Sequence, residues 1–110
     1  MKAWILKSIG QFELAEQYAL PSVKADEVLI KVRATGICGS DIQRVYQTGA
    51  HRMPWIIGHE FTGTVVALGE GVTSSWLHQR VAIFPLLPCK QCASCQKEQY
   101  ELCQNYSYLG

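Results

Sequence analysis

Four of the five cysteines of this chain lie close together, at Cys89, Cys92, Cys95 and Cys103, while Cys38 lies far from them in sequence. An odd number of cysteines makes a poor disulfide framework, and a reducing compartment disfavours disulfides in any case. The segment 89–103 also has little apolar periodicity, so something other than core burial must hold it together. Metal ligation is therefore the leading interpretation, and it constrains this part of the fold more than any other feature.

The spacing of these cysteines, C-x2-C-x2-C-x7-C, suits a zinc ion. Four thiolates can close round one Zn²⁺ as a tetrahedron, with bonds of about 2.3 Å, and such closed sites are structural. An iron–sulfur cluster is the main rival, but the ferredoxin motif places its fourth cysteine only about three residues on, followed by proline. Neither condition is met around Cys103. We predict a structural zinc lobe over residues 86–106; an iron–sulfur cluster and free or disulfide-paired cysteines are the alternatives.

The length and charge of the chain limit its architecture and its partners. With 110 residues it has room for one domain, which at this size can bury a core of its own. Ten Lys and Arg against nine Asp and Glu leave a net charge of +1, too small to hold nucleic acid or an anionic membrane surface. No apolar run approaches the roughly 20 residues of a membrane span, and the one before Lys7 is too short for a signal peptide. We expect a cytoplasmic domain with neither nucleic acid nor membrane as partner.

Short apolar or alternating segments predict a mostly β fold. Residues 2–7 and 12–15 predict two strands round a turn, and residues 61–67 and 80–84 predict two more. Residues 27–35 alternate strictly, which predicts a half-buried strand with a mostly polar outer face. Short strands separated by Gly-rich turns indicate a compact β-barrel or sandwich.

One short helix is expected among these strands. Ser40 can act as its N-cap, the helix then runs over residues 41–48, and Gly49 would end it. Glycines lie on both sides of Cys38, so this cysteine is expected in a bend where backbone freedom allows its side chain to be aimed.

Cys38, His59 and Glu60 form a second candidate metal site, with Asp41 close to the cysteine in sequence. A thiolate, an imidazole and a carboxylate leave a coordination position open, which distinguishes catalytic zinc sites from closed structural ones. Such a metal would act as a Lewis acid on an alcohol or carbonyl oxygen. The residues alone also allow a structural interpretation, in which Cys38 is a small hydrophobe and the His-Glu pair is the polar edge of a strand.

Three motifs resemble one enzyme family in their order and spacing. They are Gly36-Ile37-Cys38-Gly39-Ser40-Asp41, Gly58-His59-Glu60-Phe61-x-Gly63 and the four-cysteine run. On these motifs the chain resembles, over essentially its whole length, the N-terminal GroES-like catalytic domain of zinc-dependent medium-chain alcohol and polyol dehydrogenases. Segments 49–51, 86–89 and 106–110 are most similar to the sugar-alcohol members. The resemblance implies that residues 1–110 form a GroES-like β-barrel with short helices and a cysteine-rich zinc lobe.

The resemblance also implies a role for each residue of the second site. Cys38 and His59 would bind the catalytic zinc, and Glu60 would bind it directly or through water. Ser40 would offer its hydroxyl to the substrate oxygen as the start of a proton relay, and Asp41 would accept a hydrogen bond from His59. With the structural zinc on the four clustered cysteines, two zinc ions per chain are expected.

The activity that the resemblance implies is oxidation of a secondary alcohol, in a sugar alcohol or its phosphate, to a ketone, with hydride transfer to NAD or NADP. A Rossmann domain would bind this cofactor, but no G-x-G-x-x-G follows a strand in residues 1–110. We therefore expect these residues to bind zinc but to turn over poorly or not at all by themselves. The parent enzyme is expected to be a homo-oligomer.

Two positions depart from the family's usual pattern. Where the family has Gly-Asp-Arg-Val the chain has His78-Gln79-Arg80-Val81, and Glu98 stands where a glycine is frequent. His51 is interpreted as a solvated loop residue, and Tyr46 and Trp76 receive no role. A non-enzymatic alternative also stands, because a GroES-like barrel can serve as an interaction or oligomerisation module. Such a module needs the lobe zinc but has no use for an open second site.

Overall fold

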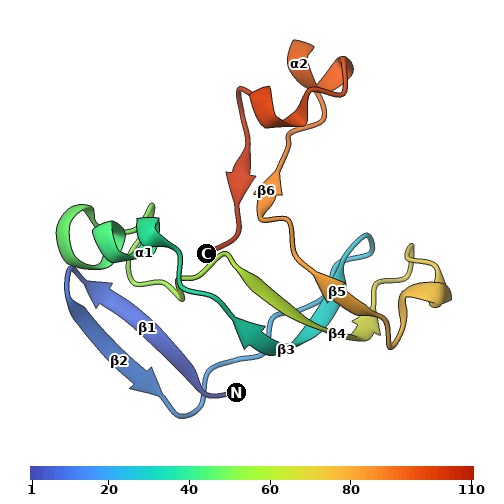
Figure 1. The fold of residues 1–110 in the computed structure, drawn as a ribbon. Coiled ribbons are helices and arrows are strands. Elements are labelled where there is room, and N and C mark those ends of the chain that lie inside the picture. The colour runs from blue at the N-terminus through green and yellow to red at the C-terminus, as the bar shows by residue number, and fades with distance from the viewer.

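The computed structural model describes residues 1–110, and seven short strands make up most of its regular structure (Figure 1). The strands are β1 Ala3–Ser8, β2 Gln11–Ala15, β3 Val28–Thr35, β4 Phe61–Leu68, β5 Arg80–Ala82, β6 Leu86–Leu87 and β7 Ser107–Tyr108. The helical segments are α1 Gly39–Gln43, η1 Arg44–Thr48, η2 Ser74–Trp76, α2 Ala93–Gln96 and η3 Tyr100–Leu102. The prediction of a mostly β fold with short helices is confirmed. None of the helices has the length and apolarity needed to cross a membrane.

The strands pair into three antiparallel sheets. β1 pairs with β2, β4 lies between β3 and β5, and β6 pairs with β7. A bridge between Leu6 and Trp55 joins β1 to the segment that precedes β4. Each of the five strands predicted from the sequence is present, with its ends within two residues of the expected positions.

The second half of β3 departs from the predicted alternation. Register shifts interrupt its pairing with β4 between Leu29 and Ile30 and again between Val32 and Ala34. Every residue from 31 to 35 is exposed, and Val32 leaves 49% of its surface in solvent. The prediction of a half-buried strand is wrong for this half, because bulges re-aim the side chains and both faces remain uncovered.

The helix that follows β3 begins two residues earlier than predicted. Its N-cap is Cys38 and not Ser40, which lies inside the first turn of α1. The cap changes because the Asp41 carboxylate folds back and accepts a hydrogen bond from the Cys38 backbone N–H, at 3.0 Å. The chain then widens into the π-helical turn η1, and Gly49 ends it as predicted, with a φ of 82°.

Both positions that depart from the family pattern adopt a left-handed backbone. His78 has a φ of 67° and Glu98 a φ of 59°, a region that glycine occupies without steric cost. The turn at His78 is fixed to β4, because its backbone N–H donates to the Val65 carbonyl at 3.0 Å. The glycines frequent in the family therefore match the backbone that this chain adopts with bulkier residues.

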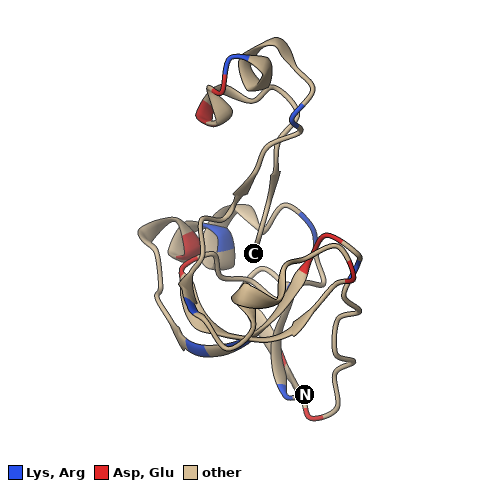
Figure 2. Ribbon diagram, turned by 90° about the vertical axis from the view of Figure 1, so that its right-hand side faces the viewer, with Lys and Arg blue, Asp and Glu red and all other residues tan.

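The paired strands β6 and β7 form a short stalk at the base of the lobe, residues 86–106, and the lobe extends away from the rest of the molecule (Figure 1). Figure 2 shows the projecting lobe in a view turned by 90°, with Lys, Arg, Asp and Glu both on the lobe and on the rest of the molecule. The lobe contains α2 and η3 and buries two of its cysteines, Cys95 and Cys103.

The chain buries less of itself than a compact domain of its size. Only 10 of 110 residues are buried, and the accessible surface is 8176 Å², against about 6,100 Å² for a compact 12.3 kDa monomer. The radius of gyration is 15.6 Å, against about 13 Å expected. The prediction of a self-sufficient core is wrong, because the lobe projects and large apolar side chains stay uncovered. Ile37, for example, is 82% exposed and Phe84 is 73% exposed.

Candidate metal centres

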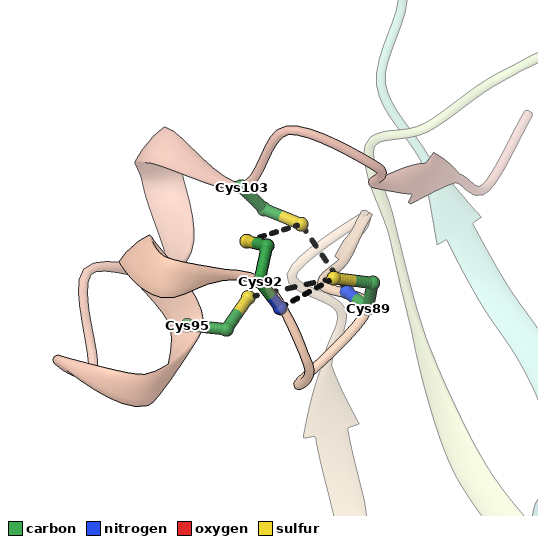
Figure 3. Close-up of side chains that lie close together, drawn as sticks. All are labelled: Cys89, Cys92, Cys95 and Cys103. Carbon is green, nitrogen blue, oxygen red and sulfur yellow. Dashed lines mark hydrogen bonds between the residues drawn. The ribbon is translucent and has the colours of Figure 1, made fainter.

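The four sulfur atoms of the lobe converge on one point (Figure 3). Cys89 Sγ lies 3.9 Å from Cys95 Sγ, Cys92 Sγ lies 4.0 Å from Cys103 Sγ, and all four sulfurs lie within 4.8 Å of one another. A tetrahedron with Zn–S bonds of about 2.3 Å has edges of about 3.8 Å. All five cysteines of the chain are free, so the disulfide alternative is excluded in this structure. We call these four residues the lobe cluster.

Local turns position the lobe cluster. Cys92 is the N-cap of α2, Cys95 lies within that helix, and Cys103 follows η3. The Cys89 sulfur accepts hydrogen bonds from the backbone N–H groups of Gln91 and Cys92, at 3.5 and 3.4 Å. The Cys89 N–H in turn donates to the Cys103 sulfur at 3.3 Å. Backbone dipoles that point at sulfur favour the thiolate form, which is the form that binds a metal.

The thiols of the lobe cluster differ strongly in acidity. Backbone hydrogen bonds, chiefly from Gln104, lower the pKa of Cys92 to about 6, and a backbone hydrogen bond from Gln91 lowers the pKa of Cys89. Burial raises the pKa of Cys95 to about 12. Four sulfurs this close cannot all be anionic without a cation between them, whereas a divalent cation stabilises all four thiolates. The ligand set, spacing and distances therefore fit Zn²⁺.

Cys38, His59 and Glu60 form a second group, which we call the mixed cluster. One ligand atom from each lies within 4.8 Å of the others. Pairing of Thr35 with Phe61 brings the end of β3 to the start of β4, and the Gly36 N–H donates to the Glu60 carbonyl at 2.7 Å. His59 is buried, Cys38 is half-buried and Glu60 is exposed. A soft thiolate, an imidazole and a carboxylate on an open surface suit a zinc ion with a free coordination position.

Asp41 connects two members of the mixed cluster. Its carboxylate is buried, with Oδ2 accepting the Cys38 N–H and Oδ1 lying 3.2 Å from His59 Nδ1. That nitrogen is itself buried and has no aligned hydrogen-bond partner, so the bond implied by the resemblance is approached but not formed in this geometry. Because Nδ1 faces Asp41, the Nε2 atom on the opposite side of the ring is free to bind a metal.

Tyr108 also belongs to the surroundings of the mixed cluster. Its ring meets the His59 ring edge to face, with centroids 5.6 Å apart and planes at 61°. A cavity of about 620 Å³ includes both residues and Glu60 in its lining. Sequence reasoning missed this contact, because only the return of the chain through β7 brings Tyr108 beside His59 and no local pattern marks it.

None of the other singled-out residues makes a side-chain hydrogen bond to the mixed cluster. Ser40 is half-buried in α1 and makes no hydrogen bond to a cluster residue, so its relay role stays a prediction. Tyr46 is 65% exposed and lines an apolar cavity beside α1. Trp76 lies in η2, and His51 lines a different cavity with Arg52.

Known proteins resemble this chain in both sequence and structure. The family model for the alcohol dehydrogenase GroES-like domain matches residues 24–110. The galactitol 1-phosphate 5-dehydrogenase of Escherichia coli K12 is 40% identical over 111 residues, covering 100% of this chain and 32% of that protein. The crystal structure of galactitol-1-phosphate dehydrogenase from Escherichia coli superposes with a TM-score of 0.91 at 38% identity, again over 100% of this chain and 32% of that one.

Two further proteins extend these comparisons. The sorbitol dehydrogenase of Bombyx mori is 43% identical over 100 residues, covering 86% of this chain and 28% of that protein. The NADH complex of the alcohol dehydrogenase RspB from E. coli CFT073 superposes with a TM-score of 0.91 at 34% identity, over 100% of this chain and 32% of that one. The chain spans about a third of the length of the curated relatives it matches.

Proposed function

This chain belongs to the alcohol dehydrogenase GroES-like domain family, and from that premise we propose that it is the zinc-binding catalytic part of a polyol dehydrogenase. The proposed reaction is oxidation of a secondary alcohol, in a sugar alcohol or its phosphate, to a ketone, with a nicotinamide as hydride acceptor. The observation that carries the proposal is the mixed cluster, since a purely structural module has no use for three unlike ligands beside an open cavity. The similarity to galactitol 1-phosphate and sorbitol dehydrogenases supports the substrate class.

We propose a separate role in this reaction for each residue around the mixed cluster. Zinc held by Cys38, His59 and Glu60 would supply Lewis acidity toward the alcohol oxygen. Asp41 fixes the Cys38 backbone through its 3.0 Å hydrogen bond and holds a negative charge beside the His59 ring. The Ser40 hydroxyl, in the first turn of α1, is proposed to start a proton relay: it would accept the proton that leaves the substrate hydroxyl while it passes its own proton on toward solvent.

Hydride transfer needs a nicotinamide site, which we propose is supplied by a Rossmann domain outside residues 1–110. The uncovered apolar surface supports this arrangement, because exposed large side chains such as Ile37 and Phe84 gain stability when another domain packs on them. We further propose that the whole protein is a homo-oligomer. We also propose a cytoplasmic location, because all five cysteines are free and free thiols persist in a reducing compartment.

Zinc content tests the proposal directly. Elemental analysis of the purified chain should give two zinc ions, one for each cluster, and the Cys38→Ala, His59→Ala double variant should give one. A Cys89→Ala, Cys95→Ala double variant is the matched control, since it should lose the lobe zinc and keep the other. If the wild type holds a single zinc that survives loss of both Cys38 and His59, the chain is a structural or interaction module and the dehydrogenase proposal fails.

A further inference from the structure

A third cavity, of about 390 Å³, lies beside the stalk of the lobe. Its walls come from two segments, the loop that precedes β4 and the strand β7 with its flanking residues. The polar side chains that line it are His51, Arg52, Tyr106, Ser107 and Tyr108. All of these side chains carry a hydrogen-bond donor, and no Asp or Glu lines the cavity.

Arg52 is the charged group of this cavity, and it is both fixed and unpaired. Its guanidinium carbon lies 3.4 Å from the ring centroid of Trp55, which also lines the cavity. Stacking on an aromatic face restricts the side chain and leaves its in-plane N–H groups free for a ligand. Arg52 takes part in none of the four ion pairs of the structure and in no side-chain hydrogen bond. The cavity therefore has a fixed positive charge without a partner.

Tyr108 connects this cavity to the mixed cluster. The same residue lines the cavity that contains His59 and Glu60, and its ring meets the His59 ring at 5.6 Å. A ligand that extends past Tyr108 could therefore have one end at the mixed cluster and the other end at Arg52.

We propose that this third cavity binds the phosphate group of a phosphorylated polyol, with Arg52 as its charged contact and with His51, Ser107 and the two tyrosines as further donors. The inference rests on the proposed function and deepens it, because it selects a polyol phosphate over a neutral polyol as the substrate class. A guanidinium matches phosphate oxygens with two parallel N–H bonds, which explains why arginine rather than lysine suits the site. His51, interpreted from sequence as a solvated loop residue, gains a role as a lining donor.

Calorimetric titration of the zinc-loaded chain with glycerol 1-phosphate, at fixed low ionic strength, tests this site. Saturable binding is expected for the wild type, with glycerol as a neutral ligand that does not bind. Arg52→Gln should weaken the binding by about tenfold or more, and Arg52→Lys should restore part of it. The matched control is Arg33→Gln in β3, which removes the same charge from a residue that lines none of the three cavities.

The outcomes separate this inference from the proposed function. Equal affinities of Arg52→Gln and Arg33→Gln, or no saturable binding by the wild type, would overturn the phosphate site. Inorganic phosphate should compete with glycerol 1-phosphate, because the phosphate group is what the cavity recognises; failure to compete would also count against the site. Zinc content and circular dichroism of the same samples report on the clusters and the fold. If the chain binds phosphate at Arg52 but holds a single zinc that survives loss of both Cys38 and His59, the phosphate site stands and the dehydrogenase proposal fails.

Discussion

The lobe cluster and the mixed cluster are assembled in opposite ways. The lobe cluster takes four sulfur ligands from one short segment, in a projection where Tyr100 and Leu102 remain exposed. The mixed cluster combines unlike ligands from two segments, which meet because β3 pairs with β4, and it includes the buried His59. A segment without an apolar core depends on its ion for order, whereas ligands placed by a sheet are in position without it.

Removal of one lobe ligand should have the largest effect. In Cys92→Ala we expect residues 86–106 to lose their order while the paired strands β3 and β4 keep theirs, because the lobe has few other contacts to hold it. Limited proteolysis followed by mass spectrometry should show cleavage within the lobe about tenfold faster or more. Ser94→Ala, in the same helix but without a ligand, is the control. Cleavage of both variants at the wild-type rate would mean that the lobe does not depend on a metal.

Asp41→Ala should act on the mixed cluster alone. The substitution leaves the Cys38 N–H without its acceptor and removes the charge beside His59, so the free energy of unfolding should fall by about 1–3 kcal/mol. Zinc content should fall from two to one per chain while the lobe resists protease as before. Asp26→Ala, an exposed position, serves as the control for urea denaturation. A lobe that loosens in Asp41→Ala would show that the two clusters are coupled.

Gly36→Ala should weaken metal binding at the mixed cluster without removing any ligand. A Cβ at this position would lie only 2.5 Å from Glu60 Oε2 and 3.1 Å from Glu60 Cβ, so the carboxylate must move. We expect about a tenfold loss of zinc affinity, or about 1.4 kcal/mol. Gly39→Ala is a matched control, since a Cβ there meets nothing within 4 Å. Competition with a chelator measures both; equal affinities would mean that the position of Glu60 does not matter for the metal.

The same contrast explains what the sequence could predict. The lobe cluster was readable from residue spacing, because its ligands are neighbours in the chain and their geometry is local. Residue spacing gave only weak support for the mixed cluster, and its prediction depended on the family resemblance. The reason is that Cys38 and His59 meet only through the pairing of β3 with β4. Tyr108 and the Arg52–Trp55 stack could not be predicted, because the contacts are made by segments whose approach depends on the whole fold.

The errors at the level of the fold have physical causes of the same kind. The alternation of residues 27–35 predicted the strand but not its burial, because two bulges and an uncovered surface are tertiary properties. Serine is a common N-cap residue, which favoured Ser40. In the structure, however, the Asp41 carboxylate accepts a hydrogen bond from the Cys38 backbone N–H, so Cys38 is the N-cap. The length of the chain permitted a compact core, but the projecting lobe and the exposed apolar side chains leave only Leu6 and Val65 as fully buried large residues.

The smallest predicted effects come from His78 and Glu98, two of the three non-glycine residues with a left-handed backbone, which lie in different parts of the molecule. His78→Gly relieves a φ of 67° in the turn before β5, and the relief exceeds the added entropy of the unfolded chain, so the free energy of unfolding should rise by about 0.5–1 kcal/mol. Glu98→Gly relieves a φ of 59° inside the lobe and should slow proteolysis there with little change in global stability. Glu70→Gly, at a position without a positive φ, should destabilise and serves as the control. Urea denaturation and lobe proteolysis measure the two responses separately.

A rise in global stability from Glu98→Gly equal to that from His78→Gly would show that the lobe unfolds together with the β3–β4–β5 sheet, and the division drawn between the two clusters would then be wrong.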